Sequence, residues 1–213
     1  MTRMRCLLLL VFAWAVLLGS SQAQTPSPAP ASPAQLAAEY FRLLQKEDYK
    51  AAATYFDDAS LKDFRDRWGF FGELPEELAR EVYPQFFGEG QTKESVAAMT
   101  DAAFFAHWLG FFQAQAKACG KVALDNWKYL GEVPEGEDTV HVLTRSRAQV
   151  GEQEFDGVVA MTFRKVKGQW KYSVPGEMLA LPALLRAELQ ASNPPEMQAM
   201  PLRVVPEREK AEN

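Results

Sequence analysis

Residues 155–174 read FDGVVAMTFRKVKGQWKYSV, and this stretch decides the fold. Val159, Met161 and Phe163 form one apolar face, and the alternate residues 158, 160 and 162 form a second that is also fairly apolar, so we expect cover on both faces. The two-residue break Lys167-Gly168 separates this run from a second one. Alternation at period two predicts strands, and so short a break predicts an antiparallel hairpin. We therefore expect an antiparallel sheet in the C-terminal half of the chain.

The period of two extends upstream of this hairpin. Short segments rich in Gly, Pro and acidic residues separate the apolar runs, so sequential neighbours are expected to pair antiparallel. The four expected strands are Leu124 to Val133, Thr139 to Val150, Phe155 to Val166 and Gln169 to Val174. After Pro175-Gly176 the spacing returns to that of a helix, which we expect from Leu179 to Leu189.

Before Gly120 the apolar residues recur at three- and four-residue steps, which is typical of amphipathic helices. The expected helices are 34–44, Tyr49 to Phe56, Leu61 to Trp68, Pro75 to Tyr83, and a longest one from Thr92 or Ser95 to Cys119. Helices followed by a meander predict an α+β domain. In it, N-terminal helices pack on a curved, four-stranded antiparallel sheet, with a long aromatic helix and an extra C-terminal helix.

The N-terminus has the pattern of an export signal. Two arginines precede an apolar run from Cys6 to Leu18, which is shorter than the ~20 residues that a membrane-spanning helix needs. Small residues at Ser21 and Ala23 predict cleavage after Ala23. We therefore expect residues 1–23 to be a signal peptide and the mature protein to be periplasmic or secreted; an uncleaved anchor is the alternative.

The remaining chain divides by composition. Residues 24–33 alternate proline with alanine and serine, which predicts an extended linker. Residues 34–190 carry the periodic patterns and form the expected domain. Residues 191–213 hold four prolines and a closing run of charges, which predicts a disordered tail.

Charge and cysteine content narrow the possible partners. The chain has a net charge of −5, and removing residues 1–23 takes away two arginines and no acid, giving −7. An acidic chain argues against a nucleic-acid partner and against membrane binding after cleavage. Cleavage also leaves Cys119 as the one cysteine, so no internal disulfide is expected. Cys119 is then a buried apolar residue, a reactive thiol or a link between chains.

Two stretches frame the expected domain. Residues 37–56 read AAEYFRLLQKEDYKAAATYF, a helix, a short acidic turn and a second helix with an aromatic residue. Residues 159–172 read VAMTFRKVKGQWKY, an apolar strand that meets a Gly-Gln-Trp turn. Together they resemble the NTF2-like superfamily, whose members include nuclear transport factor 2, ketosteroid isomerase and SnoaL-type cyclases. The resemblance implies a cone-shaped sheet around an interior pocket and, often, a homodimer, but no particular reaction.

The chain departs from that family pattern in one region. Family members commonly place a strand or hairpin after the second helix, whereas Leu61 to Gly90 is helix-like and broken by proline. The long aromatic helix and the C-terminal helix are also additions to, or exaggerations of, the family pattern.

The sequence offers few groups that could carry chemistry. Its two histidines, His107 and His141, have no metal-ligand spacing, and no nucleophile elbow or phosphate-binding glycine loop is present. We expect no metal and no cofactor. An isomerase-like mechanism would need a carboxylate base and a hydroxyl donor in an apolar pocket. The residue types exist: Asp57, Asp58, Asp101 and Asp125 as bases, and Tyr40, Tyr55 and Tyr129 as donors.

Aromatic content is the most unusual feature of the chain. Phenylalanine occurs in adjacent pairs four times, and adjacent helical residues point about 100° apart, so one member of a pair can leave the main apolar stripe. These side chains form either a thick core or an apolar pocket. The candidate pocket residues are Tyr40, Tyr55, Trp68, Phe71, Phe104, Trp108, Phe112 and His141.

Three functions remain open from the sequence. The first is an exported, non-catalytic NTF2-like module that binds an apolar small molecule or a protein partner. The second is a metal-independent, SnoaL- or isomerase-like enzyme on an apolar substrate. The third is a structural role, with the aromatic surface buried in a homodimer.

Overall fold

A computed structural model describes residues 31–118, 127–150 and 153–192. The helices are α2 (Pro33–Gln45), α3 (Tyr49–Ala53), α4 (Asp58–Arg67), the 3₁₀ helix η1 (Gly69–Glu73), α5 (Glu76–Phe87), α6 (Lys93–Ala97), α7 (Asp101–Ala118) and α8 (Gly176–Ser192). The strands are β1 (Lys128–Glu135), β2 (Thr139–Val150), β3 (Gln153–Val166) and β4 (Gln169–Tyr172). The predicted α+β class is confirmed.

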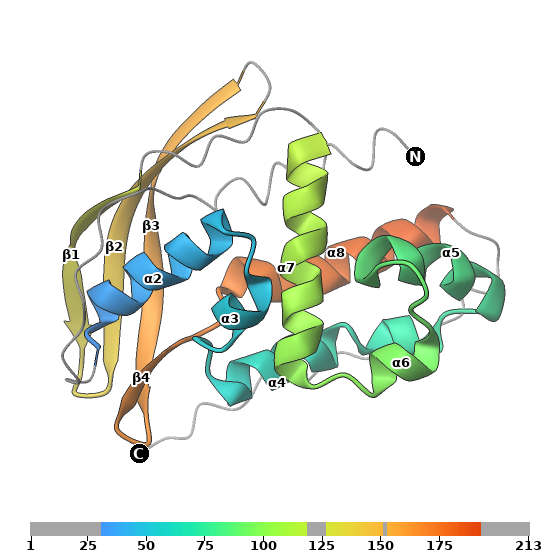
Figure 1. Ribbon diagram of the computed structural model, residues 1–213, viewed down its shortest axis with the longest axis horizontal. Helices are drawn as coiled ribbons and strands as arrows, with labels where there is room; N and C mark the ends of the chain where they lie inside the picture. Colours follow the sequence, from blue (N-terminus) through green and yellow to red (C-terminus); the bar gives the residue numbers. More distant parts are fainter. Residues whose placement is uncertain (1–30, 119–126, 151–152, 193–213) are drawn as a thin grey trace.

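The four strands form one antiparallel sheet in the order β1-β2-β3-β4. Its curved ribbon flanks the helices, and α2 lies across one face (Figure 1). That face buries alternate residues: Val142 and Thr144 on β2, and Met161 and Phe163 on β3. The period-two pattern therefore predicted the strands, but the expected cover on both faces is wrong, because Val158 on the opposite face is 45% exposed.

Local signals fix α2 against this face. Ser32 caps the helix, because its hydroxyl accepts a hydrogen bond from the Gln35 backbone while the Gln35 side chain accepts one from the Ser32 backbone. Pro33 follows at the first helical position, where its fixed φ suits a helix. The buried side of α2 includes Tyr40 and Leu44, each 2% exposed.

Helix α7 stands in the middle of the molecule (Figure 1). It packs against α3 and α4 and, through its other side, against α5. Its buried residues are Phe104, Phe105, Ala106, Trp108, Leu109, Phe112 and Gln113. The predicted long aromatic helix is therefore present at the centre of the helical layer.

The start predicted for that helix is wrong, because the chain forms two helices where one was expected. α6 ends at Ala97 and α7 begins at Asp101. Two contacts fix the break. The Thr100 hydroxyl accepts a hydrogen bond from the Ala103 backbone and so starts α7. The Arg65 side chain donates to the carbonyls of Val96, Ala97 and Met99, which closes the end of α6.

Other boundaries moved by a few residues. α3 ends at Ala53, short of the predicted Phe56, because Tyr55 and Asp57 pair their backbones with Tyr172 instead of continuing the helix. β1 continues through Pro134, which is tolerated because β1 is an edge strand. The predicted start of this strand at Leu124 lies outside the described residues. So do Cys119, the predicted signal peptide, most of the predicted linker and the predicted tail from residue 193.

Candidate functional site

Five of the predicted pocket residues come together in the helical layer. Trp68 lies 5.4 Å from Phe71 and 5.9 Å from Trp108, and Trp108 lies 4.3 Å from Phe112, all between ring centroids. Phe104 joins the same cluster through Phe64. Each of the five is at most 3% exposed. Their rings pack against one another, as expected for a thick aromatic core.

Tyr40 lies apart from that cluster, beneath the sheet. Its ring contacts Phe56 and Tyr172 at 5.4 Å each. Its hydroxyl has no hydrogen-bond partner among the described residues, and burial holds the pKa of this phenol far above its usual range. Tyr55, by contrast, is half-buried at the corner between α3 and α4.

His141 lies on the sheet face opposite the helices, because it alternates with the buried Val142 along β2. Its Nδ1 lies 3.1 Å from Thr162 Oγ1 and its Nε2 lies 2.8 Å from Glu135 Oε2. The structure therefore does not bring His141 to the aromatic cluster.

The candidate acids have structural partners. Asp57 Oδ1 accepts a hydrogen bond of 2.7 Å from the Ser60 backbone and caps α4, while Asp58 lies exposed in the first turn of the same helix. Asp101 Oδ1 lies 3.1 Å from Arg65 Nη1. Asp125 lies outside the described residues, and the candidate donor Tyr129 is 43% exposed on β1. Within residues 31–118, 127–150 and 153–192, no cluster of three or more potential metal ligands occurs.

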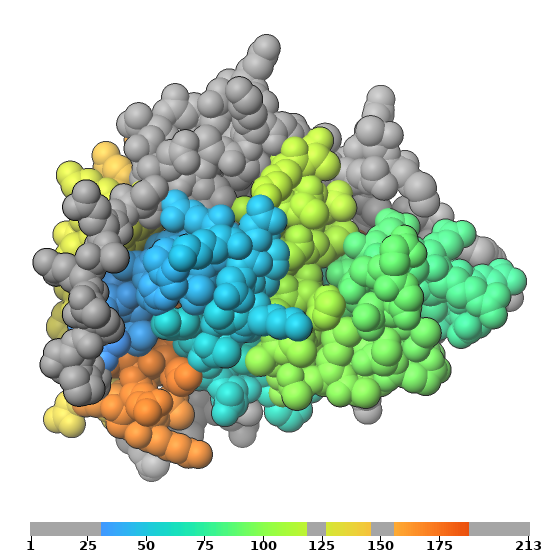
Figure 2. Space-filling view, in the orientation of Figure 1, coloured from blue at the N-terminus to red at the C-terminus, as the bar shows by residue number. Residues whose placement is uncertain are grey.

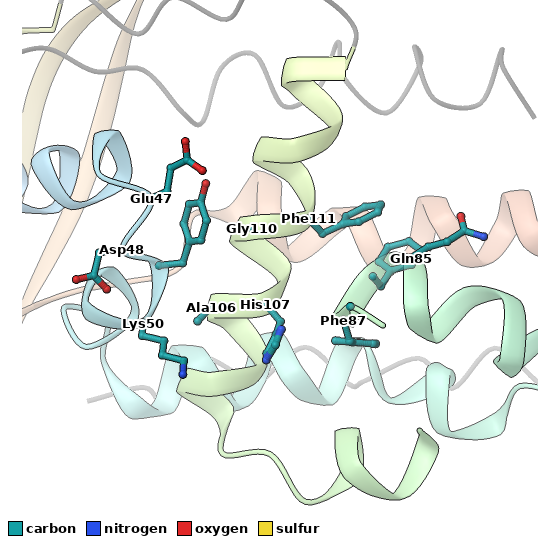
Figure 3. Close-up of a pocket in the computed structure, with 12 residues that line it drawn as sticks. Glu47, Asp48, Lys50, Gln85, Phe87, Ala106, His107, Gly110 and Phe111 are labelled. Atoms are coloured by element: carbon teal, nitrogen blue, oxygen red, sulfur yellow. The ribbon is translucent and has the colours of Figure 1, made fainter. Parts of the chain in front are cut away.

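A groove opens on the outside of the helical layer. It has a volume of about 480 Å³ and lies between the start of α3, the end of α5 and the middle of α7. In the space-filling view α7 reaches the surface between these neighbours (Figure 2). We call it the α7 groove; its lining residues are Glu47, Asp48, Tyr49, Lys50, Gln85, Phe86, Phe87, Gly88, Ala106, His107, Gly110 and Phe111 (Figure 3).

Gly110 lets α3 approach α7 at one side of the groove. A Cβ added at Gly110 would lie 3.2 Å from Tyr49 Cδ2 and 3.3 Å from Cε2, so the Tyr49 ring would have to give way. Burial and, secondarily, the charge of Glu47 raise the pKa of Tyr49 to about 12. The phenol is thus a neutral hydrogen-bond donor at physiological pH.

The other side of the groove is aromatic. Phe86 from α5 and Phe111 from α7 stack with centroids 4.1 Å apart and planes 22° apart. Their sequence neighbours Phe87 and Phe112 are buried, whereas Phe86 and Phe111 are only partly covered. In each of these two pairs one ring is buried and the other is partly exposed at the groove, as the spacing of adjacent helical residues predicts, although the buried Phe87 also contributes to the groove wall.

The charged residues that line the groove differ in whether they have an ionic or hydrogen-bonding partner. Glu47 pairs with Lys117 from α7, and Asp48 Oδ1 accepts a hydrogen bond from the Ala51 backbone as the cap of α3. Lys50 forms no hydrogen bond or ion pair within the part of the chain that the structure describes. Burial first, and then the charge of Lys50, lowers the pKa of His107 below its usual value, while a hydrogen bond with the Phe87 backbone opposes this.

The α7 groove was not predicted as a site from the sequence. One signal could have marked it: Gly110 interrupts an otherwise apolar helix, and a glycine inside a helix costs about 1 kcal/mol relative to alanine unless a close approach requires it. The meeting of α3 with α5 across α7 is a tertiary contact that no local pattern specifies.

Comparisons with known proteins do not show a family for this chain. No model of a protein family matches the chain, and no curated protein matches it. A crystal structure described as an NTF2-like transpeptidase from Campylobacter jejuni is similar to 68% of this chain over 100% of its own length, with 13% identity and a TM-score of 0.35. So low a TM-score supports no statement about activity. No described helix is long and apolar enough to cross a membrane.

Proposed function

We propose that the protein is an exported, non-catalytic, NTF2-like domain, and that the α7 groove binds a small aromatic molecule with one anionic group. The observation that carries this proposal is the groove of about 480 Å³ between a stacked aromatic pair and an unpaired lysine. Ligand sites commonly enclose about 300–1,000 Å³, with apolar walls and few polar groups.

The residues that line the α7 groove suit both the aromatic part and the anionic part of the proposed ligand. Phe86 and Phe111 present partly exposed rings, onto which a flat apolar group can stack. Glu47 and Asp48 are engaged by Lys117 and by a helix cap, so Lys50 is the cation left to attract an anion. Tyr49 and Gln85 add neutral hydrogen-bonding groups at the rim.

A pair of fluorescent probes tests this proposal. 1-Anilinonaphthalene-8-sulfonate carries fused rings and an anion, and N-phenyl-1-naphthylamine has the same ring system without the charge. Phe111→Ala should weaken both probes. Lys50→Gln should weaken only the sulfonate, by about tenfold, because a hydrogen bond to a charged group contributes about 1.5 kcal/mol or more.

Two matched variants separate the groove from other surfaces. Val158→Ala removes an exposed apolar side chain from the sheet, and Lys62→Gln removes an exposed lysine from α4. Neither should change the affinity for either probe. Equal binding of the sulfonate by the wild type, Phe111→Ala and Lys50→Gln would overturn the proposal.

The export part of the proposal has its own measurement. The observation behind it is the sequence of residues 1–23, with its short apolar run and small residues before Gln24. The intact mass of the protein recovered from its own cell envelope should match a chain that begins at Gln24. A mass that retains residues 1–23 would contradict cleavage.

A homodimer is a second candidate function, favoured by the outward face of the sheet. Val133 and Val158 are 48% and 45% exposed there, on the side of the sheet opposite α2. If this face joins two copies, light scattering should give the mass of a dimer, and Val158→Arg should convert it to a monomer. A wild-type monomer at high concentration would exclude this role.

A further inference from the structure

A second groove lies at the other end of the helical layer, where α2 meets the hairpin of β3 and β4. It has a volume of about 330 Å³. Its lining residues are Ala31, Leu36, Thr54, Tyr55, Gln169, Trp170 and Lys171, and we call it the β4 groove. It shares no lining residue with the α7 groove.

Aromatic rings give this groove its character. Tyr55 and Trp170 are both half-buried, and Leu36 adds an aliphatic surface from α2. Lys171 Nζ donates a hydrogen bond of 2.8 Å to the Thr54 carbonyl, which ties β4 to the α3–α4 corner. The ammonium of Lys165 lies 5.5 Å from the centre of the Trp170 ring and helps to hold that ring in place.

The Tyr55 hydroxyl and the Gln169 side-chain amide supply hydrogen-bond donors beside the apolar surface. Burial and then the charge of Glu39 raise the pKa of Tyr55, so its phenol keeps its proton at neutral pH. An aromatic-lined groove with nearby neutral donors is the surface on which polyproline-II segments dock, because such a segment exposes its carbonyls and has little conformational freedom to lose.

The chain itself carries a proline-rich sequence directly before a residue that lines this groove. Ala31 is a lining residue, and the cap by Ser32 with Pro33 at the first helical position fixes where it lies. A further hydrogen bond of 3.0 Å, from the Ala34 backbone to Glu132 on β1, holds the same turn against the sheet. Directly before Ala31, residues 25–30 read TPSPAP, uncharged and with proline at every second position.

We propose that the β4 groove is a polyproline-II binding site and that its occupant is the chain's own segment 25–30. Six residues in this conformation span about 19 Å. The segment needs no linker to reach the groove, because Ala31 already lies in it. Docking would fix the direction in which the mature N-terminus leaves the domain.

The absence of charge on the segment suits the groove. Lys171 is engaged by the Thr54 carbonyl and Lys165 by the Trp170 ring, so neither requires an acidic ligand. An intramolecular ligand on so short a connection has an effective concentration on the order of mM. Weak contacts by Tyr55 and Trp170 are therefore enough to keep the groove occupied.

Nuclear magnetic resonance on the full-length mature chain tests this directly. Proline δ-protons of residues 25–30 should show nuclear Overhauser contacts to the Trp170 ring. The signals of this ring are assigned by their loss in the variant Trp170→Phe. Replacing Pro26, Pro28 and Pro30 together by glycine should remove these contacts and shift the Trp170 indole signal. The indole signal of Trp68, in the aromatic core, should stay unchanged as proof of an intact fold.

A competition measurement adds a second readout. The synthetic peptide TPSPAP should bind the triple glycine variant but should require about mM concentration to displace the wild-type segment. Trp170→Ala should abolish binding of the peptide. The proposal is overturned if the triple substitution leaves Trp170 unperturbed, if the peptide binds wild type and variant equally, or if the contacts grow with protein concentration, which would assign the groove to a second copy.

Discussion

The helical layer and the sheet bury aromatic residues equally deeply but surround them with different numbers of rings. In the helical layer, the Phe64 ring lies within 6.3 Å of the rings of Trp68, Phe104, Phe105 and Trp108. On the sheet, Phe163 is equally buried, but within the described part of the chain its ring contacts only that of Tyr172, at 5.3 Å. Aromatic side chains join the helices to one another, and beneath the sheet Tyr40, Phe56 and Tyr172 also pack together. The α7 groove lies outside this packed core.

The largest expected effect is the loss of a ring from the helical layer. Phe64→Ala should lower the free energy of unfolding by about 3–5 kcal/mol, since it leaves a cavity and removes several aromatic contacts. Phe163→Ala removes the same atoms from the sheet and should cost at least about 1 kcal/mol less, because fewer ring contacts are lost. Urea unfolding of both variants measures the difference. Equal losses would show that ring contacts do not distinguish the two regions.

The next effect concerns the break between α6 and α7. Arg65→Ala should lower the free energy of unfolding by about 2–3 kcal/mol, because three backbone carbonyls and Asp101 lose a charged donor that is mostly buried. Lys62→Ala on the same helix removes an exposed pair with Asp66 and should cost about 0.5 kcal/mol at most. Urea unfolding distinguishes them, and similar values would mean that Arg65 does not hold the break.

The smallest effect is a pH dependence in the α7 groove. The pKa of His107 is lowered in the folded protein, chiefly by burial, so the unfolded chain binds a proton more readily. The contribution of His107 to stability is therefore complete above its ordinary pKa of 6.5 and is lost as the pH falls below that value. His107→Gln should remove this slope while leaving the unfolding free energy at pH 8 nearly unchanged. Unfolding midpoints from pH 8 to pH 5 provide the comparison, and an identical slope in the variant would contradict the assignment.

Local patterns were enough to predict most of the architecture. The alternation from Val159 to Phe163 predicted a strand of the sheet, though not that one face stays exposed, and the spacing of apolar residues located α2, α4 and α8 to within a few residues. These features depend on neighbours in the sequence. The split between α6 and α7 escaped prediction because Arg65, about thirty residues away, supplies the donor that ends α6.

The two grooves were harder to predict from the sequence than the fold was. Trp68, Phe71 and Trp108 have the residue types that suit a pocket, but only their packing shows that they fill one another's space. Conversely, Phe86 and Phe111 face the α7 groove because α5 ends beside the middle of α7. Which member of an aromatic pair turns outward is set by the neighbouring helix, and the pair itself carries no such information.

The pairing of Tyr55 to Asp57 with Tyr172 has a consequence for the order of folding. Tyr172 donates to the Tyr55 carbonyl at 2.8 Å and accepts from the Asp57 backbone at 2.9 Å, so two segments more than a hundred residues apart in sequence share a short parallel bridge. Loops of that length close slowly, and a chain emerging from the ribosome holds Tyr55 long before Tyr172 exists. Helices α2 to α7 can therefore collapse while the chain emerges N-terminus first, whereas α8 and the bridge between the α3–α4 corner and β4 form only after most of the chain has emerged.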